Sequence, residues 1–217
     1  MLRIVTAVML LASVPSFGAV IWAEVGDAGG LTGTAQATTG GAGLMSITGT
    51  IGSTTDADMF LIYISSPAAF SATTVGTAGT LADTQLFLFD AAGLGIYAND
   101  DNLACACQRS MLPAGNPASP TAAGWYYLVI SGFDIDPNSV GGLIFPTLPF
   151  DPVYGPTGPG GGSPISSYTG TLFLGTGTYT INLTGADAAD VPEPATAWLM
   201  GGGLTLAALL VRKRKRS

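Results

Sequence analysis

Short runs of alternating side chains, divided by turns rich in glycine and threonine, are the feature that most constrains the fold of this chain. In the run 84–90, Leu86 and Leu88 face one side and Phe87 and Phe89 face the other, which predicts a strand covered on both faces. No amphipathic helix of useful length accompanies these runs, so the pattern indicates an all-β body. We expect at least seven strands, among them residues 44–51, 58–64, 84–90, 94–98, 125–131 and 177–183.

The predicted body spans residues 44–185, after a lead-in at 24–43. It is long enough to bury one core, and short strands separated by turns fit an antiparallel sandwich of two sheets. The 31 glycines follow no repeat of three, which excludes collagen. Residues 146–164 hold six prolines and five glycines, which cannot form a strand ladder. We therefore expect a long external loop inserted in one domain; a linker between two domains is less favoured because little chain follows it.

The first 23 residues have the three parts of a secretory signal peptide: an early arginine, an apolar run and then small side chains. The cleavage point stays open. A cut after Ala23 places Ile21 at the third position before the cut, whereas a cut after Gly18 places Ser16 there. An uncleaved membrane anchor is the alternative.

Residues 195–211 contain no charged side chain. As a helix rising roughly 1.5 Å per residue they would span about 25 Å, near the lower limit for crossing a bilayer. The tail at 212–217 is costly to translocate and favours the cytoplasmic face, so the predicted transmembrane helix runs from outside to inside. The stop-transfer residues are Arg212, Lys213, Arg214, Lys215 and Arg216.

Charge is distributed unevenly along the chain. Residues 24–191 contain thirteen acidic residues and one basic residue, Arg109. Such a body is repelled by phosphates, which excludes nucleic acid and anionic lipid head groups as direct partners and leaves cations and neutral polymers. The chain has no histidine, which excludes Ser-His-Asp and Cys-His catalytic sites and imidazole-bound zinc. We therefore expect a protein that is not an enzyme.

Two prolines keep residues 191–194 extended directly before the apolar segment. Together with the glycine-rich apolar segment and the basic tail, this stretch resembles the PEP-CTERM sorting domain, also called the ice-binding protein C-terminal motif. The resemblance implies export through the translocon and recognition of the 186–194 linker by an exosortase, a membrane-embedded protease or transpeptidase. Release or transfer to the outer surface or extracellular matrix would follow, and an ordinary C-terminal anchor is the alternative. The implied sorting residues are Val191, Pro192, Glu193 and Pro194.

A second resemblance covers residues 44–185. The order Asp56-Ala57-Asp58, then 83–90, then Asn99-Asp100-Asp101 and finally 124–130 resembles the bacterial pre-peptidase C-terminal domain. The resemblance implies a jelly-roll-like β-sandwich that serves as a non-catalytic binding or secretion module, in some members with calcium. The chain departs from this family in its proline- and glycine-rich loop and in lacking an attached peptidase.

Seven aspartates fall in predicted turns or at predicted strand ends, and they need counter-charge wherever they converge. Calcium takes six to eight oxygen ligands from loop carboxylates and carbonyl groups. The candidate ligands are Asp100 and Asp101 in one turn, with Asp83 and Asp58 as partners. The alternative is that these aspartates cap turns in solvated loops.

Cys105 and Cys107 are the only thiols. In an oxidising exterior two cysteines usually pair. Because a bridge across one residue demands a tight local turn, free thiols and an intermolecular bridge stay open as alternatives.

The sequence thus predicts an exported, non-catalytic protein of the cell surface or extracellular matrix. A calcium-assisted polysaccharide-binding module is the competing prediction, and a secreted hydrolase is disfavoured because no nucleophile has a base. Trp125, Tyr126 and Tyr127 could stack against sugars, although alternation buries at least one of the three.

Overall fold

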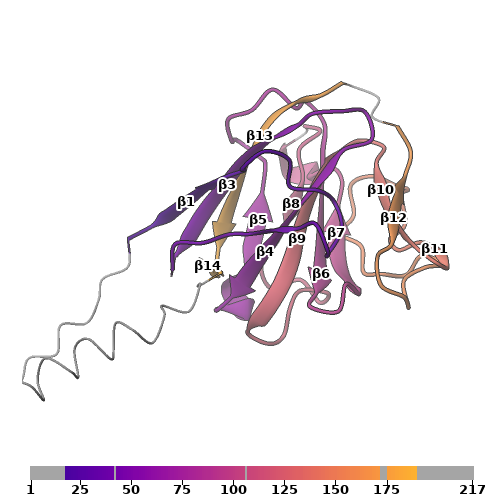
Figure 1. Cartoon of the computed structure of the whole chain (residues 1–217). Helices are drawn as coiled ribbons and strands as arrows, with labels where there is room; N and C mark the ends of the chain where they lie inside the picture. The colour runs from indigo at the N-terminus through magenta and orange to yellow at the C-terminus, as the bar shows by residue number, and fades with distance from the viewer. Residues whose placement is uncertain (1–17, 42, 106, 172–174, 190–217) are drawn as a thin grey trace, which may run out of the picture.

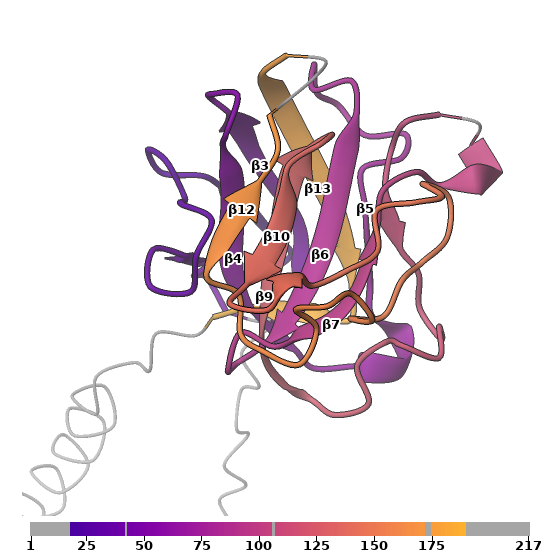
Figure 2. The same ribbon diagram turned by 90° about the vertical axis from the view of Figure 1, so that its right-hand side faces the viewer.

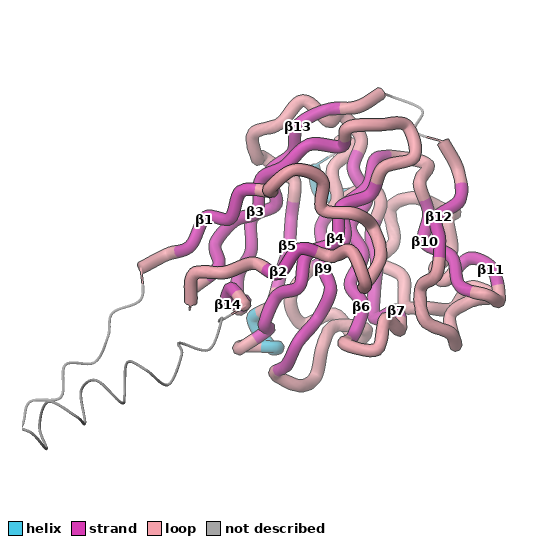
Figure 3. The backbone as a smooth tube through the Cα atoms, in the orientation of Figure 1, coloured by secondary structure: helices cyan, strands magenta, loops and turns pink. Residues whose placement is uncertain are grey.

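A computed structural model describes residues 18–189 apart from 42, 106 and 172–174. This part of the chain is all-β, as the alternating runs predict. Its only helical segments are the short 3-10 turns η1 (Pro67–Ala69) and η2 (Leu103–Cys105), coloured cyan in Figure 3. Across the described ranges, no helix has the length and apolar character needed to cross a membrane. The predicted signal peptide up to residue 17 and the predicted helix at 195–211 lie outside the described residues.

Two open sheets face each other and a smaller third sheet lies beside them (Figures 1 and 2). The first sheet has the order β1 (Val20–Ala23), β3 (Leu44–Ile51), β13 (Gly177–Thr184), β5 (Ser71–Thr73) and β8 (Met111–Leu112). The second has the order β14 (Ala186–Ala188), β4 (Ala57–Ile64), β9 (Gly124–Gly132), β6 (Thr84–Asp90) and β7 (Gly95–Asn99), and β2 (Gln36–Ala37) also pairs with β4. The third has the order β11 (Gly142–Leu143), β10 (Asp136–Ser139) and β12 (Ser167–Thr169).

Strand β6 is buried on both faces, as predicted, with only Asp90 partly exposed. On one face, Phe87 and Phe89 pack against Phe145, at ring-centroid distances of 5.7 and 5.8 Å. The 146–164 loop covers this side as well, since a Cβ on Gly95 of β7 would lie 3.0 Å from Pro156, and Tyr154 forms a β-bridge with Ala98 at the edge of the sheet. The loop is therefore a cover for the second sheet rather than a free excursion into solvent. The burial of its apolar contacts stabilises the fold.

The predicted strands match those of the structure closely: β3 and β6 have the predicted bounds, and the other four differ by one or two residues. The sheets extend beyond the predicted 44–185 body, however, because β1, β2 and β14 lie outside it. Strand β1 falls within the segment predicted to be the signal peptide. The jelly-roll order remains a prediction.

The described chain begins and ends at the same end of the body, which we call the chain-end pole (Figure 1). Val20 N–H donates to Gly43 O at 2.8 Å, and Gly43 N–H donates to the carboxylate of Asp187 at 2.6 Å. Ala188 N–H donates to Gly41 O at 3.0 Å. The same short segment therefore holds both the start of β1 and the end of β14.

Candidate functional site

Most of the buried carboxylates gather at the end of the body opposite the chain-end pole, which we call the acidic pole. Strands β4 and β6 begin at this end, whereas β1 and β7 finish there, as the strand registers require. Residues that flank these strands are thereby brought together from distant parts of the chain. The acidic pole carries Glu24, Asp27, Asp56, Asp58, Asp83, Asp100 and Asp101.

Three of the predicted ligands converge there in one group, the β7 cluster: Asp83, Asp100 and Asp101 each offer a carboxylate oxygen, and these oxygens lie within 4.8 Å of one another. Asp83 is 4% exposed, and its Oδ2 accepts a 2.7 Å hydrogen bond from Gln108 Nε2. The Oδ1 atoms of all three aspartates are buried and have no hydrogen-bond partner among the described residues. Unpaired buried acceptors are costly, which makes this cluster a candidate site for a cation.

The environment of the β7 cluster opposes ionisation. Burial, and then the nearby Asp101, raise the pKa of Asp83 to about 7, while Arg109 acts in the opposite direction. Burial, followed by Asp83, Asp101 and Asp136, raises the pKa of Asp100 to about 8. A divalent cation would supply the positive charge that these carboxylates lack.

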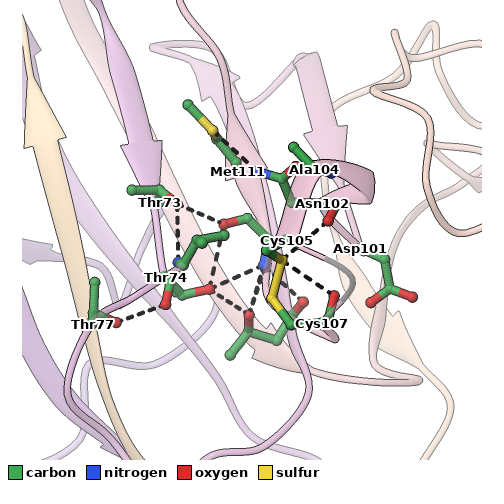
Figure 4. The surroundings of a disulfide bond; sticks show 12 residues. Thr73, Thr74, Thr77, Asp101, Asn102, Ala104, Cys105, Cys107 and Met111 are labelled. Atoms are coloured by element: carbon green, nitrogen blue, oxygen red, sulfur yellow. Dashed lines mark hydrogen bonds between the residues drawn. A yellow bond between two sulfur atoms is a disulfide. The ribbon is translucent and has the colours of Figure 1, made fainter.

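A disulfide between Cys105 and Cys107 lies beside the β7 cluster (Figure 4). Cys105 Sγ lies 3.1 Å from Asn102 O, and Asn102 N–H donates to Arg109 O at 2.8 Å. The disulfide closes a very short loop at the tip of the segment between Asp101 and Gln108, and the Asn102–Arg109 hydrogen bond closes the base of that segment. The intrachain disulfide is therefore placed to fix the approach of both side chains to Asp83.

The second group, the β1 cluster, contains Glu24, Asp27 and Asp58, whose ligand oxygens also lie within 4.8 Å of one another. Asp58 is fully buried, and its Oδ2 accepts a 2.6 Å hydrogen bond from Tyr179 Oη. Its Oδ1 has no partner within the part of the chain that the structure describes. Glu24 is fixed by two main-chain donors, Ala28 N–H at 2.9 Å and Thr50 N–H at 2.8 Å.

Gly49 leaves the space in which the β1 cluster forms. A Cβ at this position would overlap both Tyr179 Oη and Glu24 Oε2. Burial is the first cause that raises the pKa of Asp58, to about 8, and neighbouring Glu24, Asp56 and Asp27 act in the same direction. The β1 cluster thus combines a buried carboxylate, a fixed second carboxylate and a deficit of positive charge.

The structure separates one predicted ligand from the others: Asp58 belongs to the β1 cluster and not to the group formed by Asp83, Asp100 and Asp101. Sequence reasoning missed Glu24 and Asp27 because they adjoin the predicted leader. Their position directly after the apolar residues 20–23, which can form an edge strand, is the signal that could have found them. The predicted sorting residues and the basic tail lie outside the described residues.

The aromatic residues of β9 lie on two faces. Tyr126 is buried and donates from its Oη to Ala122 O at 2.9 Å, whereas Trp125 is 41% exposed. Trp125 packs edge to face against Tyr63, with 5.0 Å between ring centroids. The exposed Trp125 and the half-buried Tyr63 therefore form an aromatic pair on the second sheet near the chain-end pole, because they pair near the end of β4.

Comparison with known families finds one match: residues 190–215 match the PEP-CTERM protein-sorting motif. In the sequence the motif begins directly after Ala189, the last described residue, which lies at the chain-end pole. It indicates an exported protein that is sorted by an exosortase, its processing partner, at the membrane on its way to the surface. No curated protein matches the chain. The resemblance of residues 44–185 to the pre-peptidase C-terminal domain has no match in support and remains a prediction.

Proposed function

We propose that the chain is a non-catalytic protein of the cell surface or extracellular matrix whose acidic pole binds calcium. The observation that carries this proposal is the pair of carboxylate clusters, with unpartnered buried oxygens, at the pole opposite Ala189, the residue that the sorting motif follows in the sequence. A body attached or processed at the chain-end pole would present both clusters outwards. Calcium there would have a structural role.

The donor set suits calcium better than a transition metal. Both clusters offer carboxylate oxygens only, and the chain contains no histidine. Asp83, Asp100 and Asp101 would hold one ion, and Glu24, Asp27 and Asp58 a second, with carbonyl groups and water completing the coordination. The bound ions would neutralise the carboxylates and order the loops that join the two sheets.

Calcium binding is tested by isothermal titration of the exported protein after removal of divalent ions. We expect two binding events, one lost in Asp100→Asn and the other lost in Asp58→Asn. Asp90→Asn is the matched control, because Asp90 caps a turn at the other end of β6 through Ala92 and Leu94 N–H. Absence of calcium binding, or equal loss in all three variants, would contradict the proposal.

Sorting is tested separately, by replacing Pro192, Glu193 and Pro194 with alanine in a host that contains an exosortase. We expect the altered protein to stay in the inner membrane at its unprocessed C-terminal mass, because the extended handle is lost. Thr196→Ala is the control and should be processed normally. Unchanged release of the triple variant would refute the role of these residues.

Polysaccharide binding is a second candidate function, favoured by the exposed Trp125 beside Tyr63. Aromatic rings with one apolar face open to solvent can stack against sugar rings. A glycan array with and without a chelator tests this function and its dependence on calcium. Trp125→Ala should abolish binding, whereas Phe150→Ala should retain it, since Phe150 is similarly exposed but packs against Phe133 elsewhere.

A further inference from the structure

Strand β1 is attached to the body at both of its ends. Val20 N–H donates to Gly43 O and Glu24 N–H donates to Thr48 O, each at 2.8 Å. Between these bonds the strand pairs in parallel with β3, from Val20 opposite Leu44 to Ala23 opposite Thr48. A cut after Ala23 would remove the entire strand and leave β3 as an unprotected edge, a site for wrong pairing between chains.

The side chains of β1 also contribute to the fold. Trp22 is half-buried and packs against the core, and its carbonyl accepts a hydrogen bond from Thr48 Oγ1 at 3.3 Å. The strand leads directly into Glu24, whose carboxylate belongs to the β1 cluster. The residues before Glu24 therefore position one of the candidate metal ligands.

Gly18 and Ala19 are the two residues directly before strand β1. Both residues are exposed, and a Cβ on Gly18 would meet no atom within 4 Å. Leader peptidases accept small residues at the first and third positions before the cut. Gly18 and Ser16 provide both, whereas a cut after Ala23 places the branched Ile21 at the third position.

We infer that a leader peptidase hydrolyses the peptide bond between Gly18 and Ala19, so that β1 belongs to the mature protein. Water adds across this bond, which leaves a carboxylate on Gly18 of the leader and an ammonium group on Ala19. The new positive charge forms beside Gly43, whose N–H is bound by the carboxylate of Asp187, so a counter-charge is close. The inference rests on the export that the proposed function includes, and it moves the predicted leader boundary from residue 23 to residue 18.

The full precursor, expressed in a Gram-negative host with its own leader peptidase, provides the test. N-terminal sequencing and intact mass of the exported protein should give a chain that starts Ala19-Val20-Ile21. Gly18→Leu places a large side chain at the cut and should reduce this product at least tenfold. Ala23→Leu is the matched control, because Ala23 is exposed in β1 and a leucine side chain there would lie at the surface; its processing should equal that of the unaltered chain.

The reverse pattern overturns the inference: a mature protein that starts at Glu24 and whose formation is blocked by Ala23→Leu but not by Gly18→Leu. An exported chain that keeps all of its first 23 residues also overturns it, and in that case the signal-peptide prediction fails with it. A start at Glu24 would leave the proposed export intact and refute only the position of the cut.

Discussion

Tyr179 Oη donates a 2.6 Å hydrogen bond to Asp58 Oδ2 and thereby joins the two sheets across the core. Tyr179 belongs to β13 and Asp58 to β4, and both are almost completely inaccessible to solvent. Burial raises the pKa of Asp58, and the hydrogen bond from Tyr179 lowers it by a smaller amount. The ionised carboxylate therefore depends on Tyr179 more than the protonated one does.

Tyr179→Phe should lower the free energy of unfolding by roughly 1 kcal/mol at pH 5 and by roughly 2–3 kcal/mol at pH 9, in chelator. The difference arises because the lost hydrogen bond is made to a charged acceptor only at the higher pH. Urea unfolding at the two pH values measures it. Tyr126→Phe is the control, since its Oη donates to the neutral Ala122 O, and its cost should not change with pH.

The metal-free protein should become less stable as the pH rises. The folded-state pKa values of Asp58, Asp83 and Asp100 are about 8, 7 and 8, above the ordinary value of 3.8. Their contribution to stability is complete below the ordinary value and is lost as the pH rises through 7–8. Between pH 5 and pH 9 we expect the Tm in chelator to fall by roughly 5–10 °C.

Calcium should reverse this loss at pH 8, because ionised carboxylates are the form that binds the ion. Thermal melts in chelator and in excess calcium measure both effects. A Tm in chelator that stays constant from pH 5 to pH 9 would contradict the raised pKa values.

Gly49→Ala should destabilise the fold by about 1–3 kcal/mol and abolish calcium binding at the β1 cluster alone. The added methyl group would occupy the space of Tyr179 Oη and Glu24 Oε2. Gly33→Ala is the matched control, because a Cβ there would meet no atom within 4 Å. Calorimetric titration should find one binding event in the first variant and two in the second; two events in both would show that the space at Gly49 is not needed.

Replacing both Cys105 and Cys107 with alanine should lower the free energy of unfolding by at most about 1–2 kcal/mol, since the bridge closes a very short loop. The same change should weaken calcium binding more noticeably than it destabilises the fold. We expect roughly fivefold weaker binding at the β7 cluster, because the loop that carries Asp101 and Gln108 loses preorganisation. A reducing agent should reproduce the change in the unaltered protein and have no effect on the double variant.

Strand positions could be predicted because alternation is a local property. In β6, residues two apart face the same side and both sides are apolar, so the sequence of seven residues is sufficient to define the strand. Residues 20–23 show the limit of this approach. Their apolar character fits a signal peptide and an edge strand equally well, and only pairing with β3 distinguishes the two.

The candidate metal ligands were predictable where they adjoin in sequence and not where they meet across the fold. Asp100 and Asp101 share a turn, and Asp83 precedes the neighbouring strand of the same hairpin, so their convergence follows from local pairing. Asp58 meets Glu24 and Asp27 because strands of the two opposite sheets approach each other there. The sequence does not encode that approach in any short pattern.

Because the described chain begins and ends at one pole, proteolytic processing at either end is spatially separate from the candidate ion sites at the other pole. Cuts at residue 18 and near residue 194 would leave the described body intact from Ala19 to Ala189, and its two ends meet around Gly43 and Asp187, at the far end from both carboxylate clusters. A precursor still held by the membrane and a body already freed from it would offer the same face to an arriving ion. Cells could then change how much of this protein is tethered without changing what it recognises.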